Sequence, residues 1–84
     1  MKEKLIGEIT HYFGKINVAI VKLYDTLKEG DTIHIKGKNT DFTQTVSSMQ
    51  IDHENVKIAK KGATVGMKVN NKIKEEDEIY LVQE

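Results

Sequence analysis

β-Branched aliphatic side chains dominate this chain and recur in short runs that alternate with polar residues. Isoleucine and valine together contribute 17 of the 84 residues, whereas leucine contributes four. Such side chains lose rotamer freedom in a helix but pack well on a pleated sheet. Glycine or polar clusters interrupt the runs about every ten residues, and no window of about 11 residues has a helical period. The pattern therefore predicts an all-β chain.

Seven strands are expected. They cover residues 5–12, 18–23, 32–36, 42–51, 56–59, 65–69 and 78–82. In the first strand, Leu5, Gly7 and Ile9 are expected to share one face. In the strand that begins at Phe42, the apolar phase changes at Ser47-Ser48, which predicts a β-bulge. Because many short strands need protected edges, we predict one domain over residues 1–84, a small closed antiparallel β-barrel of six or seven strands.

Two segments 46 residues apart resemble each other. Leu27–Ile35 and Ile73–Leu81 both read as an apolar anchor, a charged turn and an alternating strand. Convergence on a common turn-and-strand pattern explains this similarity as well as an internal duplication does. Glu76 stands where the second turn would ordinarily carry glycine, so the backbone geometry of that turn is in question.

Composition excludes several classes of function. The chain has no cysteine, so we expect neither disulfides nor thiolate metal sites. Its 13 basic residues are all lysine and are balanced by 13 acidic ones. Without arginine, base-specific recognition in a duplex groove is disfavoured, while contact with a phosphate backbone stays open. No apolar run suits a signal peptide or a bilayer span, so a cytoplasmic protein with no membrane contact is expected.

Several segments resemble domain 2 of the translational GTPases, the β-barrel that follows the G domain in elongation factor Tu. They are Gly7-Glu8-Ile9, Leu27–Asp31, Val46–Ile51, and Val65–Val69 with Val56, Ala59 and Gly62 before it. The chain also resembles stand-alone translation elongation factor-like proteins and the C-terminal barrel of some collagenase-like peptidases. The resemblance implies a barrel of the domain 2 type. It does not bring GTPase activity, because Gly37-Lys38-Asn39-Thr40 lacks the spacing and the following helix of a phosphate loop.

Charge is segregated near the C-terminus. Residues 56–74 hold six lysines and no acid, and residues 75–84 hold five acids and no lysine. A lysine face of this kind is able to follow an RNA backbone. The residues predicted to contact RNA are Lys57, Lys60, Lys61, Lys68 and Lys72. The alternative is a solvated face that keeps a neutral protein in solution.

Two strands carry apolar residues on both faces. Val18 and Ile20 lie opposite Ala19 and Val21, and Tyr80 and Val82 lie opposite Ile79 and Leu81. If these second faces adjoin, Val18, Ile20, Tyr80 and Val82 form an exposed apolar patch that suits a protein partner. The alternative is that termini and loops cover them.

Aromatic and polar residues offer weaker candidates. The rings of His11-Tyr12-Phe13 and Phe42 could stack on bases, but closing the ends of the barrel is their commoner use. His11, His34 and His53 lack the paired short spacing of metal ligands, so no metal site is predicted. Ser47 and Ser48 do not follow a strand-to-helix elbow. We therefore predict no catalytic site, cofactor or bound nucleotide, and no enzyme activity.

The sequence leaves two functions open. The first is a non-catalytic translation elongation factor-like module that contacts RNA or a ribosomal component through the lysine face. The alternative is a protein-interaction module that docks on a peptidase-like or RNA-modifying enzyme through the apolar strand face. Steep weakening by salt would indicate the first, and binding that is insensitive to salt would indicate the second.

Overall fold

The computed structural model describes residues 2–83, which fold into strands and connecting turns without a helix. The strands are β1 (Lys2–Phe13), β2 (Val18–Leu23), β3 (Leu27–Lys28), β4 (Thr32–Lys36), β5 (Asp41–Thr45), β6 (Met49–Ile51), β7 (Glu54–Val56), β8 (Ile58–Ala59), β9 (Thr64–Lys68) and β10 (Glu78–Gln83). The all-β prediction is confirmed, and β2 and β4 have the predicted bounds. Between residues 2 and 83, no helix is long and apolar enough to cross a bilayer.

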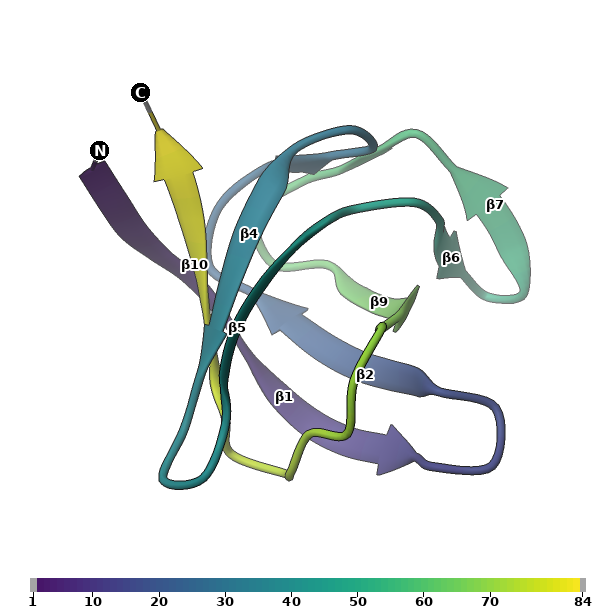
Figure 1. The fold of residues 1–84 in the computed structure, drawn as a ribbon. Coiled ribbons are helices and arrows are strands. Elements are labelled where there is room, and N and C mark those ends of the chain that lie inside the picture. Colours follow the sequence, from purple (N-terminus) through teal and green to yellow (C-terminus); the bar gives the residue numbers. More distant parts are fainter. Residues whose placement is uncertain (1, 84) are drawn as a thin grey trace.

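Eight of the strands form one strongly curled antiparallel sheet (Figure 1). Their order is β5-β4-β10-β1-β2-β9-β6-β7, and β3 pairs separately with β8. The long strand β1 is central, because it pairs with β10 along its first half and with β2 along its second half. The register shifts between Leu5 and Gly7 against β10, and between Ile9 and His11 against β2. Irregularities of this kind bend a strand and help a sheet to curl.

The strand pairing differs from the predicted closed barrel of six or seven strands. Within residues 2–83, β5 and β7 end the sheet and do not pair with each other. The expected strand over 42–51 is divided into β5 and β6, because Val46 turns inward and bonds to a neighbouring turn. Its amide donates to Asp31 O at 2.8 Å, and its carbonyl accepts from Gly30 N at 2.9 Å. Ser47 and Ser48 therefore lie between strands, and the bulges occur in β1 instead.

The two similar segments form turns with matching hydrogen bonds. In the first, Lys28 N donates to Asp31 Oδ2 at 2.9 Å, and in the second, Lys74 N donates to Asp77 Oδ2 at 2.9 Å. The residue before each aspartate has a positive φ, 95° at Gly30 and 74° at Glu76. The second turn therefore adopts the glycine-type conformation even with a glutamate, which is a strained arrangement.

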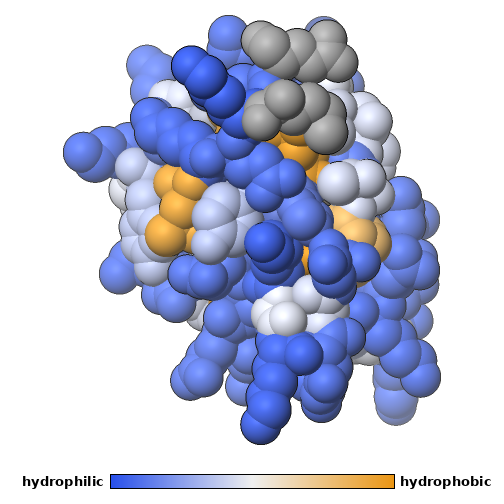
Figure 2. All heavy atoms as spheres, turned by 60° about the vertical axis from the view of Figure 1, so that its left-hand side comes forward, coloured by the Kyte–Doolittle hydropathy of each residue, from blue (hydrophilic) through white to orange (hydrophobic). Residues whose placement is uncertain are grey.

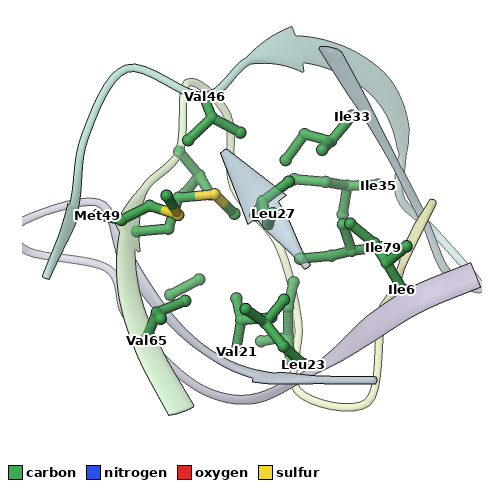
Figure 3. Close-up of a cluster of buried hydrophobic side chains, with 14 of the residues drawn as sticks. Ile6, Val21, Leu23, Leu27, Ile33, Ile35, Val46, Met49, Val65 and Ile79 are labelled. Atoms are coloured by element: carbon green, nitrogen blue, oxygen red, sulfur yellow. The ribbon is translucent and has the colours of Figure 1, made fainter. Parts of the chain in front are cut away.

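The core fills the inside of the curl (Figure 3). Side chains from eight strands and the turns between them point to this interior, and those with no more than 1% exposure include Ile6, Ile9, Val21, Leu23, Leu27, Ile33, Ile35, Val46, Met49, Val65, Met67 and Ile79. Because β1 bulges after Leu5, Ile6 is buried while Leu5 is 39% exposed. The prediction that Leu5, Gly7 and Ile9 share one face is therefore wrong at Leu5. Because side chains fill the interior, a binding site of this domain has to lie on its outer surface.

Candidate functional site

An apolar groove lies between the β1–β2 hairpin and the β6–β7 hairpin. We call it the hairpin groove. Its volume is about 350 Å³, and its lining residues are Phe13, Ile16, Val18, Ile20, Gln50, Asp52, His53, Thr64, Val65 and Gly66. The two hairpins lie on the side of the molecule away from the chain ends (Figure 1). The groove therefore lies on the opposite side of the molecule from Lys2 and Gln83.

The groove exists because two neighbouring strands diverge. Between β2 and β9 the ladder runs over five residue pairs, from Val18↔Lys68 to Lys22↔Thr64. On its other side, β9 pairs with β6 over two, Met49↔Met67 and Gln50↔Gly66. The ladder between β6 and β9 ends at Gln50↔Gly66, so the turn at Asp52-His53 lies beyond the part of β6 that pairs with β9. Gly66 lies at the bottom of the groove, and because it has no side chain it leaves space above Val18 and Ile20.

Strained turn residues form the polar wall of the groove. Asp52 and His53 connect β6 to β7 and have φ values of 51° and 67°. Two positive φ values in a two-residue hairpin define a type I′ turn, which favours Asn-Gly over residues with larger side chains. In the facing hairpin, Asn17 has a φ of 55°. Among residues 2–83, two of the four non-glycine residues with positive φ, Asp52 and His53, thus line the groove, and such strain often accompanies a functional surface.

The opposite rim is apolar and exposed. Ile16 is 61% exposed and Phe13 is 45% exposed, although both are large hydrophobic residues. The rings of His11 and Phe13 meet edge to face with centroids 4.4 Å apart. Tyr12 and Phe42 instead pack against the core. Of the aromatic residues considered in the sequence, Phe13 is therefore the one that borders the groove.

The four residues predicted to form one apolar docking face fall into two separate pairs. Val18 and Ile20 oppose Phe13 and His11 on β1 and line the hairpin groove. Tyr80 opposes Leu5, and Val82 opposes Glu3. Leu5 and His11 are six positions apart on β1, which corresponds to about 20 Å along a strand. One half of the predicted face thus belongs to the groove, and the other half lies near the chain ends.

Tyr80 has polar surroundings. Its hydroxyl donates to Glu78 Oε1 at 3.1 Å, and Lys36 Nζ lies 5.7 Å from the ring centroid. The hydrogen bond to Glu78 raises the pKa of the Tyr80 phenol, and burial and the Glu78 charge raise it further. The face that carries the chain ends is mostly hydrophilic, with small and separate apolar areas (Figure 2). This region is less suited to an apolar partner than the groove.

The five predicted lysine contacts are exposed but spread over several elements. Lys60 and Lys61 lie in the turn next to the end of β2, where Gly62 N donates to Leu23 O. Lys68 ends β9 at the other end of that ladder, opposite Val18. Lys57 lies between β7 and β8, and Lys72 lies in the segment before β10. The structure therefore does not gather them along one strand face.

His34 joins three strands near the chain ends. Its Nδ1 lies 2.8 Å from Glu3 Oε2 on β1, and its Nε2 contacts Asp41 Oδ1 on β5. The Asp41 carboxylate is the main cause of a raised His34 pKa, and Glu3 adds to it against the opposing effect of burial. The same contact lowers the pKa of Asp41. Among residues 2–83, no three histidines or carboxylates lie together in a group able to hold a metal ion.

Sequence reasoning missed the rim and the wall of the groove. Ile16 lies in the turn Gly14–Asn17, where an isoleucine is out of place, and this was the available signal for it. Asp52 and His53 form the turn between β6 and β7, and the sequence did not show that this turn lines the same groove as Phe13 and Ile16.

The chain is similar to part of a peptidase-like protein. It is 46% identical over 80 residues to a protein named as an uncharacterized protease of Methanocaldococcus jannaschii. The match covers 94% of this chain and 20% of that protein, so the chain spans about a fifth of the length of this relative. No protein-family profile matches the chain.

Solved structures show the same fold. The C-terminal domain of a protein described as a "putative U32 peptidase" from Geobacillus thermoleovorans superimposes with a TM-score of 0.89 at 17% identity. The superposition covers 95% of this chain and 93% of that domain. A selenomethionine variant of the same domain gives a TM-score of 0.85 over 90% of this chain and 96% of that one.

These similarities correct the assignment to translation. The expected kinship with domain 2 of the translational GTPases is wrong, and so is the function of a translation elongation factor-like module that binds RNA or the ribosome. The motifs behind that expectation, such as the Leu27–Asp31 turn, are set by the geometry of a turn entering a strand. A small curled sheet of any function needs such turns, so they did not distinguish the families. The second resemblance noted in the sequence, to a C-terminal domain of peptidases, agrees with the comparisons.

Proposed function

We propose that this chain is a non-catalytic β-domain of a U32 peptidase-like protein, and that it acts by binding protein. The observation that carries the proposal is the 46% identity over 94% of the chain to a fifth of an archaeal protease. The likeness in fold to a C-terminal domain of a U32 peptidase supports it. On this proposal the domain assists the peptidase part by contact. Peptide hydrolysis is carried out by the four-fifths of the protein outside the matched segment.

We also infer that the curled sheet behaves as a closed barrel. The support is a side chain that joins β5, one end of the sheet, to the segment after β9. Gln44 Nε2 donates to Lys68 O at 3.0 Å, and Gln44 Oε1 accepts from Asn70 N at 2.8 Å. These two bonds tie β5, one edge strand of the sheet, to the end of β9, which lies near the other edge. A cytoplasmic location stays a prediction.

A chimera tests the proposed function. The matching fifth of the M. jannaschii protease is replaced by this chain, and the thermal unfolding of the chimera is compared with that of the isolated 84-residue chain. We expect the domain to unfold at a higher temperature in the chimera, because contact with the peptidase part stabilises it. The isolated chain should not cleave labelled casein. Identical unfolding temperatures, or cleavage by the isolated chain, would contradict the proposal.

A further inference from the structure

The hairpin groove has the shape and composition of a site for a side-chain anchor. Its volume of about 350 Å³ lies near the lower limit of ligand cavities, which are about 300–1,000 Å³. This is room for one or two large side chains rather than for an extended ligand. The side chains of Val18 and Ile20 form its floor beside Gly66, which adds no side chain of its own. Apolar anchors that fill such pockets supply most of the binding energy of a protein interface.

The residues that border the groove are also of the types found around an anchor pocket in a protein–protein interface. Ile16 and Phe13 offer apolar contact area on one side. Gln50, Asp52 and His53 offer hydrogen-bonding groups on the other side. A protein interface has this arrangement, with an apolar centre and a polar, solvent-exposed rim. The rim carries both an acid and a histidine, so it has no single strong charge that would select an RNA backbone.

We propose that the hairpin groove is the surface on which the peptidase part of a U32-like protein docks, by inserting an apolar anchor side chain. This inference rests on the proposed function. The peptidase part is the occupant because four-fifths of the archaeal relative lies outside the matched segment. The face at the chain ends is mostly hydrophilic (Figure 2), whereas the groove presents exposed Phe13 and Ile16 at the far end of β1.

Amide hydrogen exchange tests the location of the contact. Exchange is measured for the isolated chain and for the same chain within the M. jannaschii chimera. We expect protection to rise at least tenfold, as an order of magnitude, in peptides that cover residues 13–20, 50–53 and 64–66. Peptides that cover β4 and β5 should exchange alike in both. Protection at β4 and β5 instead of the groove would overturn the inference and leave the proposed function standing. Equal exchange everywhere would contradict both.

Paired substitutions make the test specific. Ile16→Asp places a charge on the groove rim, and Ile58→Asp is its matched control, because Ile58 is also exposed, at 50%, but lies on β8. In the chimera, Ile16→Asp should abolish about nine-tenths of the added protection of residues 64–66, and Ile58→Asp should leave it unchanged.

Gly66→Ala provides a second probe. The added Cβ would lie 3.7 Å from Val18 Cγ1 and from Ile20 Cδ1, which is ordinary contact, so the domain keeps its fold while the groove floor rises. It too should reduce the added protection. If neither Ile16→Asp nor Gly66→Ala changes it, the groove is not the docking surface.

Discussion

The amide of Gln44 is expected to hold the curled sheet together. The side chain is 6% exposed and lies on β5, opposite Ile33 of β4. It accepts from Asn70 N at 2.8 Å and donates to Lys68 O at 3.0 Å. Removing both bonds leaves two backbone groups without partners, and each such group costs about 1–3 kcal/mol when buried. Because Lys68 and Asn70 are both exposed residues, the low end of the summed cost applies, and we expect Gln44→Leu to lower the free energy of unfolding by about 2–3 kcal/mol.

That loss is large for a domain of this size. The total free energy of unfolding expected for 84 residues is about 4–13 kcal/mol. A loss of 2–3 kcal/mol should lower the melting temperature by roughly 10–20 °C. Urea and thermal unfolding, followed by far-UV circular dichroism, measure both quantities. An unchanged free energy of unfolding in Gln44→Leu would refute the idea that the amide joins the sheet.

Gln44→Glu separates the two hydrogen bonds. The carboxylate still accepts from Asn70 N, but it faces the carbonyl oxygen of Lys68 without a proton to donate. Protonation restores the donor, so the pKa of the new carboxyl should be raised above its usual value of about 4.3. The variant should therefore approach wild-type stability near pH 4. It should lose stability as the pH rises above about 4.3, until the raised pKa is passed.

Gln50→Glu is the matched control. Gln50 Nε2 donates to Asn55 Oδ1 at 3.1 Å, but both side chains are exposed. Exposed substitutions usually change stability by no more than about 0.5 kcal/mol. If Gln44→Glu and Gln50→Glu changed the free energy of unfolding equally at all pH values between about 4 and 7, the Gln44 amide would not have the role assigned to it.

Three further substitutions test other parts of the fold. Glu76→Gly should stabilise the domain by about 0.5–1 kcal/mol in urea unfolding, because relief of the left-handed strain exceeds the added entropy of the unfolded chain; a loss of stability would contradict this. Gly37→Ala should destabilise it by about 1–3 kcal/mol, because the new Cβ overlaps Asp77 Oδ1, and an unchanged melting temperature would show that the turn adapts. His34→Gln should lower the free energy of unfolding between about pH 3.8 and pH 6.5, the usual pKa values of Asp and His. In that range the charged His34 ring pairs with the Asp41 and Glu3 carboxylates and stabilises the fold. The difference from wild type should shrink as the pH rises through the raised His34 pKa, and a constant difference from pH 5 to 9 would count against the ion pairs.

Local patterning predicted the regular part of this fold. The alternation in β2 and β4 determines which residues face the core, so the bounds of both strands could be read from the sequence. The similar turns before β4 and β10 were also visible, because an aspartate bonded to the amide three residues earlier requires a fixed spacing. These features depend on residues that are neighbours in the chain.

The remaining features depend on contacts between distant segments. Val46 leaves its strand to pair with the turn at Gly30-Asp31, and nothing near Val46 in the sequence indicates that partner. The bulge after Leu5 arises where β1 exchanges pairing partners. The hairpin groove requires Ile16 and His53, which lie in different hairpins, to line the same hollow. For the same reason, Tyr80 and Val82 could not be separated from Val18 and Ile20 by pattern alone.

If this domain serves a peptidase-like protein through an apolar protein contact, the two should bind each other as separate chains. Calorimetric titration of the 84-residue chain with the folded peptidase part of the M. jannaschii protease, at low and high salt, measures that binding. We expect a complex of one domain to one peptidase part, with an affinity that changes less than about threefold between 50 mM and 500 mM salt. No binding, or binding that falls steeply with salt as lysine-to-phosphate contacts do, would contradict it.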